Sequence, residues 1–221
     1  MIVMDNLDRQ SFLWYEIDEY LQQAQQHNAV LDKERKCFVK KNEHDEVVFS
    51  LIPPLIHRID TEENIEEYRN NLHIEEEICF AIILIQAGAA ALGIWWNDEC
   101  THHKVITAYM VRKKQGKSQL THLNQKGKSR QGSRIRLNNT IRFFENINVK
   151  LEEWYEDLEA CQRLFYSCTP RLWGELFRSK IDCPIDKEDP RWCRIPMDIK
   201  VPNFKELQRV AFKTTHGGIL Q

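Results

Sequence analysis

The chain has 221 residues, of which 42% are hydrophobic and 29% are charged, and its formal net charge is −2. This is the composition of an ordinary globular protein that is long enough to bury a full core. The seven cysteines lack the paired spacing of a zinc site, so we expect reduced thiols, no metal, no cofactor and a cytoplasmic location.

The first third of the chain predicts a helix, a hairpin and a second helix. Apolar residues recur at helical spacing from Asp8 to about His27, which predicts an amphipathic helix. Two short strands, Cys37 to Lys40 and Val47 to Leu51, flank a polar turn. A second helix begins at Thr61, with acidic residues in its first turn. Asp5 makes the amino terminus acidic before an apolar core builds, so we expect no signal peptide.

The next part of the chain predicts three strands, at residues 78–85, 90–96 and 104–111, joined by short turns. Short connections imply antiparallel neighbours. Residues 78–96 carry no charge over nineteen positions, a length that can span a bilayer as a helix. The polar interruption at Gln86 and the acidic residues on both sides favour two buried strands instead, and we expect no membrane association.

A long helix is predicted to begin between Ser129 and Ser133, because either residue can act as its N-cap. Apolar residues at spacings of three and four mark the stripe that we expect this helix to bury. They are Leu137, Ile141, Phe144, Leu151, Tyr155 and Leu158.

The last part of the chain predicts a strand at Arg163–Ser167, a short helix at 170–180 and an amphipathic helix at 203–214 that ends at Gly217-Gly218. We therefore expect an α/β fold with a mixed, largely antiparallel sheet flanked by helices.

The expected organisation is a single domain over residues 1–221. It has an N-terminal helical extension at residues 1–34 and a core at about residues 35–216.

The middle of the chain carries a charge opposite to that of the remainder. From Cys100 to Phe144 there is no Asp or Glu, while eleven Lys or Arg residues occur. Without those eleven, the 31 basic residues of the chain fall to 20 against 33 acidic residues, which is a net charge of −13. Clustered cations displace condensed counterions from a polyanion. The asymmetry predicts a polyanionic partner for this segment, and a solvated, solubilising loop is the alternative. The partner that we expect is an RNA phosphate backbone, and no DNA is expected.

Residues 112–136 form a polar and basic connector between a strand pattern and a helix pattern. Gly116 and the amides of Gln115 and Gln119 lie inside its cationic run, where a solubilising loop has no need of them. Glycine permits backbone conformations that other residues resist. The order of residues favours a mobile catalytic loop at residues 112–133 that handles RNA.

The string Y-M-V-R-K-K-Q-G-K-S-Q at residues 109–119, followed by G-K-S at 127–129 and G-S at 132–133, resembles a known family. It is similar to the release-factor-like domain of the eukaryotic ribosome-quality-control peptidyl-tRNA hydrolases or tRNA nucleases. That domain is related to the middle domain of eukaryotic and archaeal class I peptide release factors. The resemblance covers roughly Cys79 to Val210, and it implies a release-factor middle-domain-like fold in a bacterial-type, stand-alone member.

The resemblance implies that Gln119 is the counterpart of the glutamine in the release factors' G-G-Q motif, with Gly116 and Ser118 as its flanking loop positions. Lys117 stands where the family usually has a second glycine. The implied partners are the large subunit of the ribosome and peptidyl-tRNA. The cations expected to bind RNA are Arg112, Lys113, Lys114, Lys117, Lys126, Lys128, Arg130 and Arg134.

An amide has no useful pKa, so Gln119 is not expected to act as a general base. Its value is positional, because it can orient a water and donate to a developing oxyanion or to the leaving 3′ oxygen. We therefore expect an enzyme that hydrolyses peptidyl-tRNA. Three alternatives stay open: a tRNA 3′-end endonuclease that uses the same loop, a non-catalytic ribosome or RNA-binding module, and an interaction protein that binds no RNA.

Overall fold

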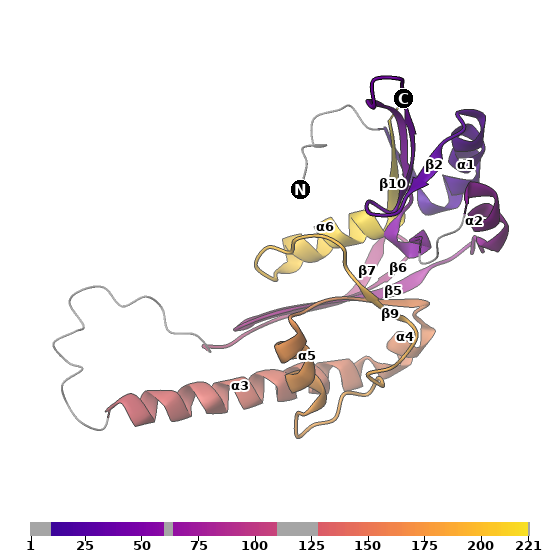
Figure 1. Ribbon diagram of the computed structural model, residues 1–221. Coiled ribbons are helices and arrows are strands. Elements are labelled where there is room, and N and C mark those ends of the chain that lie inside the picture. Colours follow the sequence, from indigo (N-terminus) through magenta and orange to yellow (C-terminus); the bar gives the residue numbers. More distant parts are fainter. Residues whose placement is uncertain (1–9, 60–63, 110–127, 221) are drawn as a thin grey trace. The chain divides into compact units, whose positions relative to one another are not determined.

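The computed structural model describes residues 10–59, 64–109 and 128–220 (Figure 1), and the side chains of residues 128–133 and 135 lie outside this description. Among the residues described, no helix combines the length and apolar character that crossing a membrane requires.

The chain divides into two compact units. The first, called here the terminal unit, comprises Met1–Glu77 and Arg209–Gln221, and the second, the central unit, comprises Ile78–Gln208. The division arises because the last strand of the chain pairs with strands from its first third. A local pattern in the sequence does not contain that long-range pairing.

The terminal unit is built on an antiparallel sheet in the order β1-β10-β4-β3-β2. Its strands are β1 (Gln10–Leu13), β2 (Val30–Asp32), β3 (Cys37–Lys41), β4 (Val47–Ile52) and β10 (His216–Leu220). The predicted hairpin is present as β3 and β4.

Two predictions for the terminal unit are wrong, and both concern residues that form the paired strands β1 and β10. Residues 10–13 form a strand rather than the start of a helix, and Gly217-Gly218 lies inside β10 rather than stopping a helix. Phe12 is paired with Gly217, and a Cβ atom at Gly217 would lie 2.2 Å from the Phe12 ring. Glycine is therefore needed there for the close approach of the two strands, not for a helix end.

The helices of the terminal unit are α1 (Ile17–Gln26) and α2 (Ile65–Asn71), with short 3-10 helices at Trp14–Glu16 and Leu55–His57. α1 buries its apolar face in a core that contains Phe38 and Phe49. Asp18 of α1 accepts a hydrogen bond from the Arg69 guanidinium of α2, with 2.8 Å between Oδ2 and Nη2. This hydrogen bond holds the pKa of Asp18 below its usual value.

The central unit contains a mixed sheet in the order β7-β6-β5-β8-β9. Its strands are β5 (Cys79–Gln86), β6 (Ala89–Trp96), β7 (Glu99–Thr107), β8 (Arg163–Ser167) and β9 (Trp192–Arg194). β5, β6 and β7 are antiparallel, whereas β8 runs parallel to β5 and β9 runs parallel to β8. The predicted fold class, a mixed and largely antiparallel sheet flanked by helices, is confirmed.

Strand β7, the third of the predicted strands in chain order, begins earlier than predicted. β6 and β7 are joined by the two residues Asn97 and Asp98, and Trp96 pairs directly with Glu99. Asn97 has a φ of 55°, a conformation that asparagine adopts more readily than most residues in a tight hairpin turn. The short turn places the start of β7 at Glu99 and its end at Thr107, rather than at 104 and 111.

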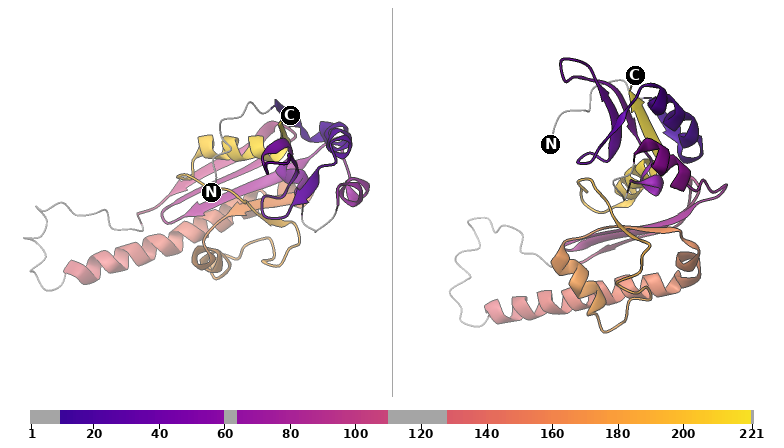
Figure 2. Two further views of the ribbon diagram at one scale, coloured as in Figure 1. Left: turned by 45° about the horizontal axis from the view of Figure 1, so that its top comes forward. Right: turned by 45° about the vertical axis from the view of Figure 1, so that its right-hand side comes forward.

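Three helices cover one face of this sheet, as Figure 2 shows: α3 (Lys128–Glu153), α4 (Tyr155–Ala160) and α5 (Pro170–Phe177). The segment before and at the start of α6 (Phe204–Thr215) lies on the opposite face. There the Gln86 side chain donates to the carbonyls of Ile199 and Lys200, and the rings of His103 and Phe204 are 4.3 Å apart.

The buried stripe of α3 differs in part from the prediction. Phe144 and Leu151 are buried as expected, together with Phe143 and Ile147, and Leu158 is buried in α4 rather than in α3. Three predicted members of the stripe are exposed: Leu137 at 60% and Ile141 at 37% in the first half of α3, and Tyr155 at 40%, which begins the separate helix α4. The first half of α3 extends past the ends of the strands (Figure 1), so its residues have no sheet to cover.

Asn148 explains the polar position in the middle of the α3 stripe. Its side chain is fully buried, and its Nδ2 donates to the carbonyls of Leu176 and Ile181 at 2.9 and 2.7 Å. These carbonyls belong to the last turn of α5 and to the segment after it. Asn148 therefore joins the second half of α3 to α5.

Candidate functional site

The predicted catalytic loop connects β7, the edge strand of the central sheet, to α3. Residues 110–127 lie outside the described part of the chain. This holds for the predicted catalytic residues Gln119, Gly116 and Ser118 and for the predicted RNA-binding residues Arg112, Lys113, Lys114, Lys117 and Lys126. The structure describes the two elements that flank the loop.

Three predicted RNA-binding residues belong to the first half of α3. Lys128 and Arg130 fall within the bounds of the helix, although their side chains lie outside the description. Arg134 is described, and its side chain is exposed. Exposure on the part of α3 that continues from the loop leaves the Arg134 guanidinium accessible to a phosphate.

The end of β7 is held by two hydrogen bonds to different elements. The backbone N–H of Ala108 donates to the carbonyl of Gly88 at 2.9 Å, which ties the strand end to the β5–β6 turn. Gly88 has a φ of 89°, a conformation that favours glycine. This bond fixes Ala108, which precedes the last described residue before the loop, to the sheet.

Asn139 provides the second hydrogen bond. Its Nδ2 donates to the carbonyl of Tyr109 at 3.1 Å, across an interval of 30 residues. The bond links the last described residue before the loop to the fourth turn of the helix that follows it. Sequence reasoning missed Asn139, although two consecutive asparagines inside a helix, where this residue type is disfavoured, are a signal of a specific role.

The charge on α3 changes sign along the helix. Its first turn contains no acidic residue. From Glu145 to Cys161, by contrast, the chain has six Asp or Glu residues and one lysine. Positive charge near a helix N-terminus and negative charge near its C-terminus are the reverse of what the helix dipole favours. The cations beside the loop are therefore not explained by the stability of the helix.

Two features of the described residues concern metal and thiol chemistry. No group of three or more His, Cys, Asp or Glu side chains among them could hold a metal ion. Burial raises the pKa of Cys168 to about 12 and that of Cys183 to about 11. Both thiols are thus protonated at neutral pH and are poor nucleophiles.

A solved structure shares this fold. The Vms1 mitochondrial localization core superposes with a TM-score of 0.52 over 94% of this chain and 85% of that chain, at 15% sequence identity. At this identity the likeness shows the fold alone.

Two curated proteins are similar to this chain in sequence. The tRNA endonuclease ANKZF1 of Homo sapiens is 29% identical over 159 residues, which are 71% of this chain and 22% of that protein. The Mus musculus protein of the same name is 28% identical over 139 residues, or 62% of this chain and 18% of that protein. The chain therefore spans about a fifth of the length of these curated relatives.

Fold and sequence together define a release-factor-like protein, which confirms the resemblance drawn from the loop motif. The family model described as Bacteroidetes VLRF1 release factor (bVLRF1) matches residues 80–220, and the chain belongs to this family.

Proposed function

We propose that this chain is a release-factor-like peptidyl-tRNA hydrolase that acts on stalled or obstructed ribosomal complexes in the cytoplasm. The observation that carries the proposal is the family match over residues 80–220. It spans β7, the whole basic connector with Gln119, and α3. The motif thus lies within the part of the chain that belongs to a release factor family.

In the proposed reaction a water attacks the carbonyl carbon of the ester between the peptide and the tRNA 3′ oxygen. The C–O bond to tRNA breaks, the peptide leaves as a carboxylic acid, and the 3′ oxygen takes a proton. Gln119 orients the water and donates a hydrogen bond to the developing negative charge. Gly116 and Ser118 shape the loop, while Lys117 replaces a flexible position with a cation.

The cations of the connector would hold the tRNA and the large ribosomal subunit. Arg112, Lys113, Lys114 and Lys126 belong to the loop, and Lys128, Arg130 and Arg134 continue along α3. A contact with phosphate in this region is worth more than a surface ion pair, because it releases condensed counterions from RNA.

The second candidate reaction is cleavage of the tRNA backbone near its 3′ end. The name shared by the curated relatives, tRNA endonuclease, favours it. In that reaction the ribose 2′-hydroxyl attacks the adjacent phosphorus, giving a cyclic phosphate and a free 5′-hydroxyl. Lysines of the loop would stabilise charge on the phosphate.

One experiment separates these reactions. Purified protein is incubated with stalled ribosome–nascent-chain complexes, and free peptide, intact tRNA and shortened tRNA are resolved. Wild type is compared with Gln119→Ala and with Gln125→Ala, a glutamine of the same connector outside the motif. We expect peptide release with intact tRNA for wild type and for Gln125→Ala, and a loss of about 100-fold or more for Gln119→Ala, as for other groups that stabilise an oxyanion.

Each product pattern has one meaning. Shortened tRNA that depends on Gln119 would replace the hydrolase with the nuclease. Neither product, with binding to the complexes retained, would make the connector a docking segment and contradict both reactions. Equal losses in the two glutamine variants would remove Gln119 from its central role.

A further inference from the structure

A row of exposed side chains follows the outer side of the first half of α3. Successive positions three and four apart lie on one side of a helix. The described members of this row are Arg134, Leu137, Asn138, Ile141 and Arg142, and each is exposed. We call these five residues, together with Lys104 of β7, the α3 ridge.

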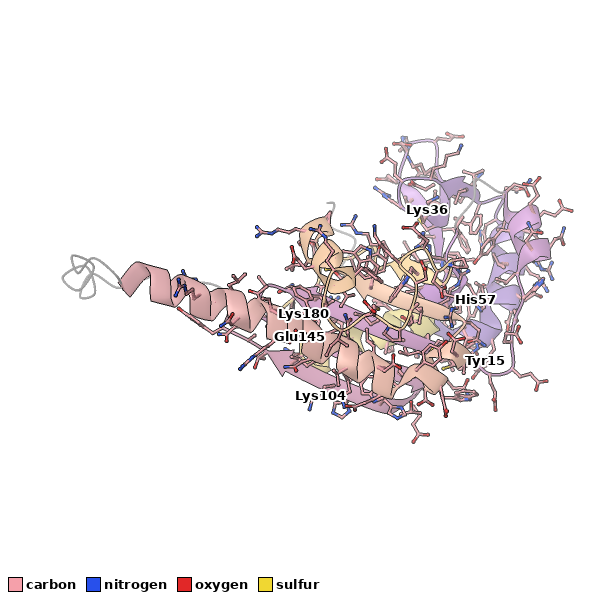
Figure 3. The ribbon with its side chains drawn as sticks, turned by 90° about the horizontal axis from the view of Figure 1, so that it is seen from below. Tyr15, Lys36, His57, Lys104, Glu145 and Lys180 are labelled. Atoms are coloured by element: carbon pink, nitrogen blue, oxygen red, sulfur yellow. The ribbon has the colours of Figure 1, made fainter. Side chains whose placement is uncertain are left out.

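Lys104 joins the ridge from the neighbouring strand. It is exposed and lies two residues from Ile106, whose side chain is buried in the same core as Phe143 of α3. Residues two apart in a strand point to the same face of the sheet. Lys104 is therefore on the face that α3 covers, at the free edge of β7, where Figure 3 shows it near the helix.

The cations of the ridge have no acidic partner within the described residues. No ion pair there joins Lys104, Arg134 or Arg142 to a carboxylate. From Cys100 to Phe144 the sequence has no Asp or Glu, so no acid of this segment compensates these charges. By contrast, Lys150 in the second half of α3 pairs with Glu153, and Arg191 pairs with Glu159.

The ridge does not serve the folding of the central unit. Leu137 is 60% exposed and Ile141 is 37% exposed, so neither side chain is buried in its core. The sign of charge along α3 opposes the helix dipole, as described above. A surface that combines uncompensated cations with exposed apolar side chains fits an external anionic partner better than a solvated face.

We infer that the α3 ridge binds the phosphodiester backbone of RNA outside the catalytic loop. Arg134 and Arg142 are eight residues apart, which is about 12 Å along a helix axis, so they contact separate phosphates. The planar guanidinium of arginine matches phosphate in a bidentate manner. Leu137 and Ile141 lie between them and offer apolar surface to ribose. The inference rests on the proposed RNA partner but not on the reaction catalysed.

The chemistry of the ridge fits two sources of backbone, tRNA and ribosomal RNA. The binding of fluorescent deacylated tRNA and of vacant ribosomes is measured between 50 and 300 mM KCl, concentrations chosen at roughly the range where such binding is salt-sensitive. The variants are Arg134→Gln/Arg142→Gln and Lys104→Gln. The matched control is Arg171→Gln/Arg178→Gln, which removes one exposed arginine from α5 and one from the position directly after it.

We expect the arginine pair on α3 to weaken binding by about tenfold and to reduce the slope of log K against log salt by about 1.5, at 0.7 to 0.9 per lost phosphate contact. Lys104→Gln should reduce the slope by about half of that amount. An effect on tRNA assigns the ridge to tRNA, and an effect on ribosomes alone assigns it to ribosomal RNA.

Three results would overturn the inference. The first is a salt slope of the α3 arginine variant that equals wild type for both RNAs, and the second is an equal change of slope in the Arg171/Arg178 control. The third is tighter binding of poly-glutamate than of RNA of equal charge. Gln119→Ala is measured in the same assay. A salt slope of Gln119→Ala that equals wild type, with no product formed by the wild-type protein, would reject the proposed reaction. It would not contradict RNA binding by the ridge. Circular dichroism melting checks that the arginine and lysine substitutions, all at exposed positions, keep the fold.

Discussion

Asn139 binds the last described residue before the loop, because its amide donates to the carbonyl of Tyr109. The loop is anchored at one end by its continuity with α3 and at the other by Tyr109, so the Asn139–Tyr109 bond sets the distance between the two anchors. A neutral hydrogen bond of this kind is worth about 1 kcal/mol, or roughly a fivefold effect on a rate.

Replacing Asn139 should therefore act on turnover rather than on affinity. We expect Asn139→Ala to lower the rate of product formation about fivefold while the Kd for ribosomal complexes stays within about twofold, because no RNA contact is removed. The control is Asn146→Ala, at an exposed asparagine of the same helix that is not a member of the ridge. Single-turnover kinetics give the rate. Equal rates for the two variants would exclude a positioning role for Asn139.

At the scale of elements, the short helix α4 depends on one arginine from another part of the central unit. Arg191 donates from Nη1 to the carbonyls of Leu158, Glu159 and Cys161 at 2.9, 3.2 and 3.2 Å. Its Nη2 bonds Asp189 at 2.9 Å. The guanidinium thus satisfies the free carbonyls at the end of α4 and joins them to the segment before β9.

Loss of this arginine should destabilise the central unit. We expect Arg191→Gln to lower the free energy of unfolding by about 2 kcal/mol, because several carbonyls lose a charged donor. Urea denaturation followed by tryptophan fluorescence measures the change. Lys187→Gln, at an exposed lysine nearby in the sequence, is the control and should change stability by less than about 0.5 kcal/mol.

The same pair gives a pH dependence with a definite sign. The hydrogen bond from Arg191 holds the pKa of Asp189 below its usual value. A carboxyl whose pKa is lower in the folded state stabilises the protein above its unfolded pKa, near 4, and this contribution is lost as pH falls through the folded pKa. The decrease in the free energy of unfolding caused by Arg191→Gln should therefore be complete at pH 7 and become smaller below about pH 4. A cost that is constant down to pH 2.5 would contradict this account.

At the scale of the whole molecule, the separation of charge is the dominant feature. A segment with eleven basic and no acidic residues is joined to a remainder with 33 acidic residues. Such a distribution attracts RNA to one region and repels it from the others, so it orients the protein during association.

Charge removal in the loop should weaken RNA binding in a salt-dependent way. We expect Lys113→Ala/Lys114→Ala to reduce the slope of log K against log salt by up to about 1.8. Lys40→Ala/Lys41→Ala, on β3, removes the same charge from the terminal unit and serves as the control. If both double variants change the slope equally, net charge rather than the position of the lysines governs binding.

The motif and the charge pattern could be recognised without coordinates because both depend on residues close together in the chain. The same holds for the β3–β4 hairpin, the strand Arg163–Ser167 and the order of strands in the β5–β6–β7 meander, where short turns force antiparallel pairing. The buried second half of α3 follows from its period of 3.6 residues.

Contacts between distant residues were decided only by the tertiary structure. Phe12 lies in a strand because it pairs with Gly217, some 200 positions away, and that partner overrides the local helical pattern. Leu137 and Ile141 continue the apolar period of α3, yet the sheet ends before it reaches them. Asn139 bonds Tyr109 across the loop. The sequence by itself determined the class of protein and the charge of its loop, because these are local properties. The anchoring of the loop and the exposed ridge required the fold, because they depend on which distant elements meet.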